Sequence, residues 1–466
     1  MLTRRIRDDD LIRIRYYGRK VKGLGAAEEH GKIGVTVSPS AFEVLAPVFK
    51  KFQVLGNVGA LTTTLWSLVY CPSYANFATQ LTLDSLTLEL LPSETTHWKN
   101  IISTASIKRF TIAYMRDSSS CIVEPLMNPL QLNYCDFTSL EVLDAIAVRT
   151  PWNSLFSLSS VPNLRILHIY ITSDDLAIFL STNSNERDFQ NLTDFRLISD
   201  DPRQCSKLLL RPGFHNLQSL QISYLAASIV EWDFDSFCET LRATQASNTL
   251  LRTVRVSVQY WRSDTQVIPP PSQRRFITAT TLKPLFCFTN LECLLLDLGC
   301  GVNINDKTLY DASQAWPKLK ILELPEHTRF SKPEITFSGL AELAKSCPLL
   351  EVVSLRINGL SDLIPVPECV GENLTSLHIS MSPIDSDSHK VGRMLAKLFP
   401  KLQRVSSSWY MWYAFGYLSS PFDMTPLEKE YLARWSLVNT YLLGPCRGRD
   451  TCICASFDLW NPVRGP

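Results

Sequence analysis

The sequence predicts an α/β repeat solenoid, in which a curved parallel sheet lies inside and helices lie outside. Three observations lead to this fold class. The chain has 466 residues, more than the about 250–300 over which one compact core grows. A short apolar phrase recurs along it at intervals of 24 to 40 residues. Apolar side chains at helical spacing fill several of these intervals, so each unit is expected to contain a strand, a turn, a helix and a turn.

The recurring phrase is a leucine, two variable residues, an apolar residue, one variable residue and another apolar residue. Leu164–Leu167–Ile169 and Leu291–Leu294–Leu296 are clear copies. This is the phrase of a leucine-rich repeat, and its last two apolar residues point to one face of a strand. Stacked copies share a continuous core that one copy cannot form alone. The first leucines of the copies are Leu140, Leu164, Leu192, Leu217, Leu251, Leu291, Leu319, Leu350, Leu374 and Leu402, and weaker copies lie at Leu81–Leu83 and Phe110–Ile112.

The residues around the phrase also recur. An asparagine often precedes the first leucine, as in Pro162-Asn163-Leu164, and a lysine replaces it in Pro400-Lys401-Leu402. The helices between copies are expected to begin at short oxygen-bearing side chains, because these accept hydrogen bonds from unpaired N–H groups. Candidate capping residues are Asp174, Asp306 and, for the helix before Leu402, Ser386 or Asp387.

Three segments follow from the pattern. Residues 1–60 are predicted to form an N-terminal helical cap or linker, residues 61–408 the solenoid, and residues 409–466 an aromatic cap and a tail. Residues 1–22 hold eight basic and three acidic side chains, with the acids first, which suits the dipole of a packed helix that Gly23 or Gly25 ends. Binding of phosphate or nucleic acid is the alternative for that stretch.

Composition and motifs argue against several classes of function. The net charge is +1, so no global field attracts nucleic acid or a membrane surface. The sequence has no nucleophile elbow, no phosphate-binding glycine loop and no metal-binding histidine motif, so we expect no enzyme, no cofactor and no metal. Its apolar runs are too short to cross a bilayer. Thirteen scattered cysteines and no apolar signal segment predict an intracellular, cytoplasmic or nuclear protein.

The candidate functional surface is the concave face of the sheet. In each phrase, the residue between the last two apolar positions points away from the core, where aromatic and arginine side chains on a rigid scaffold can anchor a protein partner. A solvated face without a partner is the alternative. The candidate protein-binding residues are His168, Tyr170, Arg196, Gln221, Arg255, Glu323, Arg356 and His378.

Two further segments have a structural and a functional interpretation. Trp409, Trp412 and Tyr413 belong to an aromatic run after the last repeat, which either caps the final core or forms a binding pocket at the end of the groove. The longest interval holds Pro269-Pro270-Pro271 and is either a tolerated insertion or a loop that closes over the concave face.

The repeats resemble those of leucine-rich-repeat F-box proteins, and the N-terminal residues resemble the fungal mushroom-type group of that family. The similar stretches are Asp8-Asp9-Asp10-Leu11-Ile12-Arg13, Tyr16-Tyr17-Gly18-Arg19-Lys20-Val21 and Ser38-Pro39-Ser40-Ala41-Phe42. The resemblance implies a substrate-recognition subunit of a Skp–cullin–F-box ubiquitin ligase, with a protein client and with the Skp adaptor and cullin as partners. The F-box module is not evident in residues 1–60. A free-standing scaffold or inhibitor with no ubiquitin role is the alternative.

Overall fold

The fold was obtained as a computed structural model, and it divides into two compact units. Unit 1 comprises Met1–Leu217 with Ile222–Tyr224, and unit 2 comprises Gln218–Gln221 with Leu225–Pro466. Each unit is described by itself. The described residues are 23–24, 60–64, 84–90, 107–114, 137–182, 188–225, 233–245, 250–259, 276–298, 300–326, 332–360, 370–380, 382–406 and 425–443.

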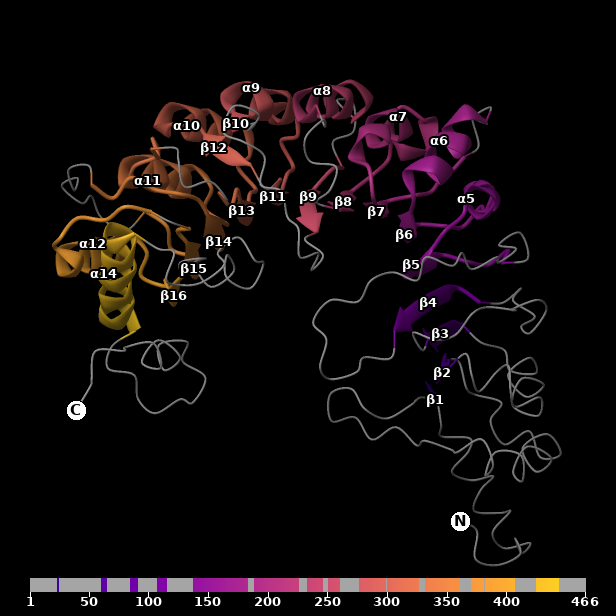
Figure 1. The fold of residues 1–466 in the computed structure, drawn as a ribbon, viewed down its shortest axis with the longest axis horizontal. Helices are drawn as coiled ribbons and strands as arrows, with labels where there is room; N and C mark the ends of the chain where they lie inside the picture. Colours follow the sequence, from indigo (N-terminus) through magenta and orange to yellow (C-terminus); the bar gives the residue numbers. More distant parts are fainter. Residues whose placement is uncertain are drawn as a thin grey trace, which may run out of the picture. The chain divides into compact units, whose positions relative to one another are not determined.

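Unit 1 is a parallel sheet whose strands pair in chain order, with short helices after the later strands (Figure 1). The strands are β1 (Gly23–Leu24), β2 (Ala60–Thr64), β3 (Ser85–Leu90), β4 (Arg109–Tyr114), β5 (Val142–Arg149), β6 (Ile166–Ile171) and β7 (Asp194–Ser199). The helices are α5 (Trp152–Ser159), α6 (Ser173–Ser181) and α7 (Cys205–Leu209), with 3-10 turns η2 (Pro202–Gln204) and η3 (Pro212–Phe214).

Unit 2 repeats the same arrangement. Its main parallel sheet contains β9 (Thr253–Gln259), β11 (Cys293–Asp297), β13 (Ile321–Glu323), β14 (Val352–Ser354), β15 (Ser376–His378) and β16 (Arg404–Ser406). Strand β8 (Ser219–Leu225) is divided between the two units, and β10 (Phe276–Thr278) pairs in parallel with β12 (Gly301–Asn303). The helices are α8 (Phe234–Gln245), α9 (Ala279–Leu282), η6 (Lys283–Cys287), α10 (Asp306–Ala315), α11 (Phe337–Ser346), α12 (Ser388–Leu398) and α14 (Pro426–Leu443).

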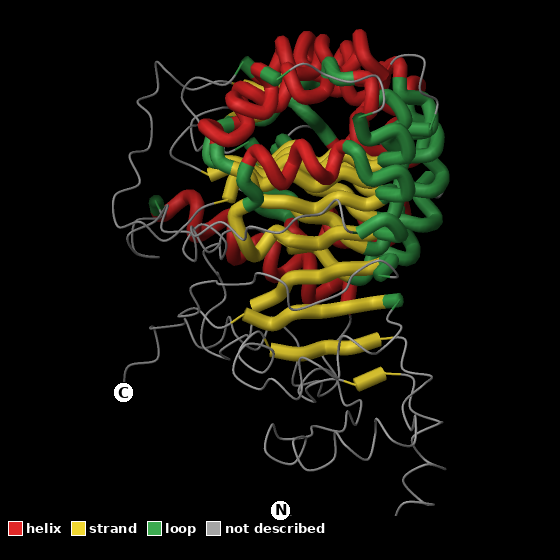
Figure 2. The backbone as a smooth tube through the Cα atoms, turned by 90° about the vertical axis from the view of Figure 1, so that its right-hand side faces the viewer, coloured by secondary structure: helices red, strands yellow, loops and turns green. Residues whose placement is uncertain are grey.

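The strand register follows the repeat phrase. In unit 1, Leu143, Leu167 and Phe195 are register partners on β5, β6 and β7. In unit 2, the partners in strand order are Val254, Leu294, Leu322, Val353, Leu377 and Val405. All of these side chains are buried. The predicted leucine-rich-repeat solenoid is therefore confirmed in each unit, where these buried side chains form a continuous core. Figure 2 shows the stacked strands with helices beside the later ones.

One weak copy of the phrase was predicted at Leu81–Leu83, which lies outside the described residues. The strand β3 begins just after it, at Ser85, and its core residues are Leu86 and Leu88. The other weak copy, at Phe110–Ile112, lies in β4 as predicted, and both residues are buried. Apolar residues two apart recur within the stretch from Leu81 to Leu90, so local alternation does not fix the register. Pairing with β4 fixes it.

The asparagine before the first leucine binds the preceding repeat. The Asn163 side-chain amide donates to the Thr138 carbonyl at 3.2 Å, Asn191 donates to Pro162 at 2.7 Å, and Asn373 donates to Pro348 at 2.9 Å. Where a lysine takes this place, Lys401 Nζ donates to the Asn373 Oδ1 atom at 3.0 Å. These bonds satisfy carbonyls at the turns, where no strand partner is available.

Helix starts follow the predicted chemistry but not every predicted residue. Asp387 caps α12 by accepting from the Lys390 N–H at 2.9 Å, as one of the two alternatives proposed. Asp174 and Asp306 were wrong as N-caps, because Thr172 caps α6 and Asn305 caps α10. Asp306 instead accepts from the backbone N–H and the hydroxyl of Thr336, both at 2.7 Å, and Thr336 is the N-cap of α11.

A short strand lies within the segment predicted as an N-terminal cap. Gly23 and Leu24 form β1, which pairs in parallel with β2, so a helix that runs on to Gly25, one of the two predicted ends, was wrong. The physical reason is that β1 supplies partners for the backbone groups at the edge of β2. The helix predicted to end at Gly23 lies outside the described residues. The other residues of segment 1–60, apart from Ala60, lie outside the described residues.

A helix in the predicted C-terminal segment covers the last repeat. On α14, the Trp435 indole N–H donates to the Ser382 carbonyl at 2.9 Å, and Trp435 and Val438 are buried. Asn439 accepts from the Val405 N–H of β16 at 3.3 Å, and Tyr441 packs against Gly392 of α12. The final apolar face of unit 2 is thus closed, as every solenoid requires. The aromatic run predicted for this task, with Trp409, Trp412 and Tyr413, lies outside the described residues.

Candidate functional site on the open face of the sheet

The side chains that alternate with the core residues of each strand form what we call the open face, opposite the helices. The residue between the two core positions forms one row per unit. In unit 1, the row comprises Thr87, Thr111, Asp144, His168 and Arg196, which are register partners on consecutive strands. In unit 2, it comprises Arg255, Leu295, Glu323, Ser354, His378 and Ser406. Of the predicted site residues, the structure brings His168 and Arg196 together in the first row and Arg255, Glu323 and His378 into the second.

His168 lies between two carboxylates in unit 1. Its Nδ1 atom is 3.5 Å from Asp144 Oδ2 on β5, and its Nε2 atom is 3.6 Å from Asp194 Oδ1 on β7. Burial alone would lower the pKa of His168, but the two carboxylates outweigh it and raise the pKa to about 9. The imidazole is therefore a cation near neutral pH, which suits an ion pair and not a general base.

Asp144 and Asp194 are functional candidates that sequence reasoning missed. A signal was present for Asp144, because it occupies the row position of the copy that begins at Leu140, directly after Leu143. That copy ends in Ala145 in place of a large apolar residue, so its row position was not recognised. Asp194 lies one step before the row, two residues from Arg196, on the same face of β7.

Arg196 is half-buried in the row. Its side chain makes no ion pair or hydrogen bond to any described residue, and its Nε atom is buried without a partner. Arg196 is the register partner of His168, whose imidazole is protonated, so two positive side chains lie next to each other on β6 and β7. A cation held in this way on a rigid strand can bind an incoming acceptor.

In unit 2, Arg255 and Glu323 lie on either side of Leu295. The Arg255 Nε atom donates to the Cys293 sulfur at 3.3 Å. Burial raises the pKa of Glu323, Arg255 opposes this shift, and Asp297 adds to it. Gln221, on β8, is half-buried as well. These residues present charged and amide groups on the open face, as their repeat positions predict.

His378 occupies the row position in β15 and lies between two serines. Its Nδ1 atom contacts the Ser406 hydroxyl on β16, and its Nε2 atom is 3.2 Å from the Ser376 hydroxyl. Hydroxyls can donate or accept, so they bind the ring without requiring a particular charge.

Tyr170 is a predicted contact residue whose expected exposure was wrong, because its side chain is fully buried in the structure. The physical reason is a register shift in β5 between Ala145 and Arg149, which makes Arg149 the neighbour of Tyr170. Burial raises the pKa of Tyr170, as do Asp200 and Asp175, against the effect of Arg149. Its ring therefore belongs to a polar cluster where the strands end.

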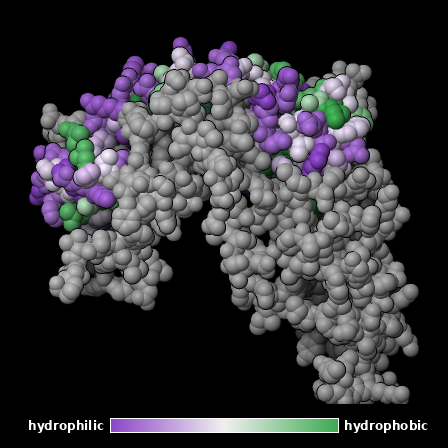
Figure 3. Space-filling view, viewed as in Figure 1, coloured by the Kyte–Doolittle hydropathy of each residue, from purple (hydrophilic) through white to green (hydrophobic). Residues whose placement is uncertain are grey.

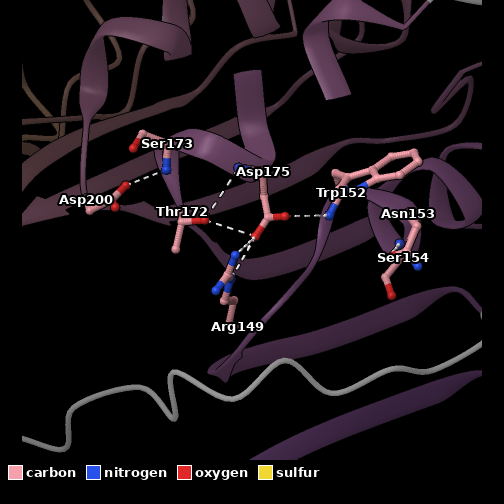
Figure 4. Close-up of polar contacts among 8 residues, drawn as sticks. All are labelled: Arg149, Trp152, Asn153, Ser154, Thr172, Ser173, Asp175 and Asp200. Atoms are coloured by element: carbon pink, nitrogen blue, oxygen red, sulfur yellow. Dashed lines mark hydrogen bonds and ion pairs between the residues drawn. The ribbon is translucent and has the colours of Figure 1, made fainter. Parts of the chain in front are cut away.

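That cluster joins two consecutive repeats (Figure 4). Asp175 on α6 accepts from Arg149 Nε at 2.7 Å and from the Trp152 N–H, the first residue of α5, at 3.3 Å. In the next repeat, Asp200 accepts from the Ser173 N–H at the start of α6. Each carboxylate thus neutralises the positive end of a helix, and the cluster has a structural role.

Arg356 lies just after β14, and its side chain is only 10% exposed. It pairs at 3.1 Å with Glu326, whose side chain is 1% exposed. A buried pair of this kind leaves little of the guanidinium for a partner, so Arg356 contributes to the scaffold more than to an accessible surface.

Cys205 and Cys347 belong to the core. Burial raises the pKa of Cys205 and Cys347 to about 12, so these thiols stay protonated and act as small apolar core residues. Among the residues that the structure describes, three or more His, Cys, Asp or Glu side chains are nowhere arranged to hold a metal ion. Within the same residues, no helix is both long and apolar enough to span a bilayer.

The outer surface over the helices is mostly hydrophilic. Figure 3 shows hydrophilic side chains there, with small hydrophobic groups between them. The exposed apolar residues include Trp152 and Phe156 on α5, Ile178 on α6, and Leu437 on α14. Separate exposed apolar side chains are ordinary on soluble proteins and do not define a site.

Comparison with known proteins adds one structural similarity. No protein-family model matches the sequence, and no curated protein sequence matches it. Among solved structures, an internalin from Listeria monocytogenes is similar, with 13% sequence identity, a TM-score of 0.36, and coverage of 86% of this chain and 94% of the internalin. The leucine-rich-repeat fold is established here by the strand register and the core of each unit.

Proposed function

We propose that the chain is a protein-interaction scaffold that holds a protein client on the open face of its sheet and performs no catalysis itself. The observation that carries this proposal is the row of charged, half-buried side chains at one repeated position, on strands that are fixed by a continuous core. Polar and arginine side chains on a rigid surface provide orientation and specificity at low entropic cost. We propose a location in the cytoplasm or nucleus, in keeping with the free cysteines among the described residues.

Position-specific photo-crosslinking tests this proposal. A benzophenone amino acid replaces Glu323 in the row of unit 2, and in a matched control it replaces Tyr310, which is exposed on the outer face of α10. After irradiation in extracts of its own cells, a discrete protein adduct is expected for position 323 and not for position 310. Equal adducts at both positions, or none at position 323, would place the client elsewhere.

The finer proposal is a client receptor similar to those of Skp–cullin–F-box ubiquitin ligases. It rests on the resemblance of residues 8–21 and 38–42, which lie outside the described residues. No residue of the open face contributes to this resemblance. Affinity purification of the chain, scored for the Skp adaptor and a cullin by mass spectrometry, tests it. Recovery of both supports the ligase role, and capture of other proteins without them favours a scaffold or inhibitor with no ubiquitin role.

A further inference from the structure

Three buried polar atoms in the row of unit 1 lack a hydrogen-bond partner, although one of them belongs to the ion pair between His168 and Asp144. They are Asp144 Oδ1, His168 Nδ1 and Arg196 Nε, and their residues are register partners on β5, β6 and β7. Among the described residues, only two other buried side-chain atoms lack a hydrogen bond, on Thr150 and Ser388. Folded proteins satisfy nearly all buried polar atoms, so the side chains of this row are incompletely paired within the chain. The three atoms themselves are covered, and a ligand would meet the exposed parts of the same side chains, such as the Asp144 carboxylate, whose side chain is 34% exposed.

Together with Asp194, this row carries two negative and two positive side chains, which balance in number but are only loosely paired. His168 stands between Asp144 and Asp194 at 3.5 and 3.6 Å, distances too long for strong hydrogen bonds. Arg196 has no carboxylate of its own among the described residues. The row therefore keeps an acceptor at its β5 end and a charged donor at its β7 end.

Complementarity of charge restricts what can bind there. A lone anion at Arg196 would be repelled by Asp144 and Asp194, and a lone cation at Asp144 would be repelled by His168 and Arg196. A segment that carries both signs matches both ends, because a carboxylate can accept two hydrogen bonds from a guanidinium while an ammonium or guanidinium donates to Asp144. Neither end is then left with an unpaired buried charge.

The spacing of the row sets the spacing of the ligand. Neighbouring strands lie about 4.8 Å apart, so Asp144 and Arg196 are separated by roughly 10 Å across β6. A polyproline-II segment advances about 3.1 Å per residue with three residues per turn, so its residues i and i+3 share a face about 9 Å apart. Extended segments of this kind bind grooves and sheet faces without first having to fold.

We propose that Asp144 and Arg196 bind an extended client segment in which an acidic and a basic side chain are three residues apart, the acid against Arg196 and the base against Asp144. This inference rests on the proposed function, and it names the chemistry of the client at unit 1. His168 positions the Asp144 carboxylate and keeps a second positive group beside Arg196.

A random dodecapeptide phage library, captured on the full chain at pH 7, tests this proposal. Peptides with Asp or Glu three positions from Lys or Arg are expected to be enriched at least tenfold over the unselected library. Arg196→Gln should abolish the preference for the acid and keep that for the base, and Asp144→Asn should do the reverse. Synthetic peptides from the selection should bind each variant at least tenfold more weakly than the wild type.

The matched control is Arg242→Gln, which changes an exposed arginine on the helix α8, outside the open face, whose Nε atom is 2.8 Å from Glu239 Oε2. It should leave the selected sequences unchanged. Arg196→Gln removes no ion pair to a described residue and should melt no lower than the wild type, whereas Asp144→Asn should melt lower at pH 7, because Asp144 stabilises the protonated His168. Circular dichroism of both variants at the temperature of the binding experiment keeps a loss of binding distinct from a loss of fold.

Three outcomes would overturn the inference: no enriched peptide, enrichment without the charged pair, or the same peptides on both variants. If both variants select the same peptides, Asp144 and Arg196 do not bind the client, and water alone solvates their side chains. If the peptides are instead lost with Arg255→Gln or Glu323→Gln, the open face still binds a client and the proposed function survives without this inference. The photo-crosslinking experiment at position 323 tests the proposed function independently of this inference.

Discussion

His168 in unit 1 and His378 in unit 2 occupy the same position of the repeat but differ in their neighbours. Both follow a fully buried leucine and precede a fully buried isoleucine. His168 lies between the carboxylates of Asp144 and Asp194, whereas His378 lies between the hydroxyls of Ser376 and Ser406. The repeat thus specifies where a side chain stands, and the adjacent repeats specify its charge and what it can bind.

The largest expected effect tests what the two positions share. Leu167→Asp and Leu377→Asp each put a carboxylate into a fully buried core site next to the histidine. Each should lower the free energy of unfolding by more than about 5 kcal/mol, because a cavity and an unpaired buried charge are created together. Circular dichroism during urea unfolding measures the loss. A small loss in one unit only would mean that its core is not built by the same register.

The second effect compares a buried ion pair in each unit. Arg211 Nη1 is 3.3 Å from Asp188 Oδ2 with both side chains at most 6% exposed, and its Nη2 atom donates to two backbone carbonyls. Arg211→Met should cost about 3–5 kcal/mol, since it leaves Asp188 buried without its cation. Arg356→Met, at the pair with Glu326, should also cost about 3–5 kcal/mol, because it leaves a carboxylate that is 1% exposed without this cation. Thermal unfolding of both variants measures the two losses, and a variant that melts like the wild type would contradict this account for its unit.

The third effect concerns pH and separates the two histidines. The pKa of His168 is about 9 in the folded chain against 6.5 for the free side chain, so protonation favours folding. This stabilisation is complete below pH 6.5 and is lost as the pH rises through 9, with a total of about 3 kcal/mol.

Urea unfolding between pH 6 and 10 measures this dependence. His168→Gln should remove it, and the matched variant His378→Gln should leave it in place. A nuclear magnetic resonance titration gives the midpoint for His168 directly. A midpoint near 6.5 would show that the two carboxylates do not hold the proton.

The smallest effect tests the turns between repeats. Asn163→Ala and Asn373→Ala each remove one hydrogen bond to the preceding repeat, to Thr138 and Pro348 respectively. Each should cost about 1 kcal/mol, because one partly exposed bond is lost and the freed carbonyl can turn to water. Thermal unfolding of the two variants measures the loss. Asn163→Asp serves as a comparison and should lose as much stability as Asn163→Ala, since aspartate lacks the amide donor.

Several features were predictable because they depend on residues close in sequence. The leucine phrase fixed the strand cores from Leu143 to Val405, and the caps Thr172, Asn305 and Asp387 are residue types that the helix starts require. The exact capping residue was missed at Asp174 and Asp306, because neighbouring oxygen-bearing side chains compete for the same role. The strand β1 and the helix α14 were missed, since neither carries the repeat phrase.

By itself, the sequence determined the solenoid, its strand register and the position of the row residues, because the period of the apolar residues decides which side chains enter the core. The tertiary structure decided the burial of Tyr170, the charge on His168 and the isolation of Arg196. These properties depend on side chains one repeat away, such as Asp144 and Asp194. Electrostatic energy falls with distance in space, and stacking of repeats brings together residues that the chain keeps apart.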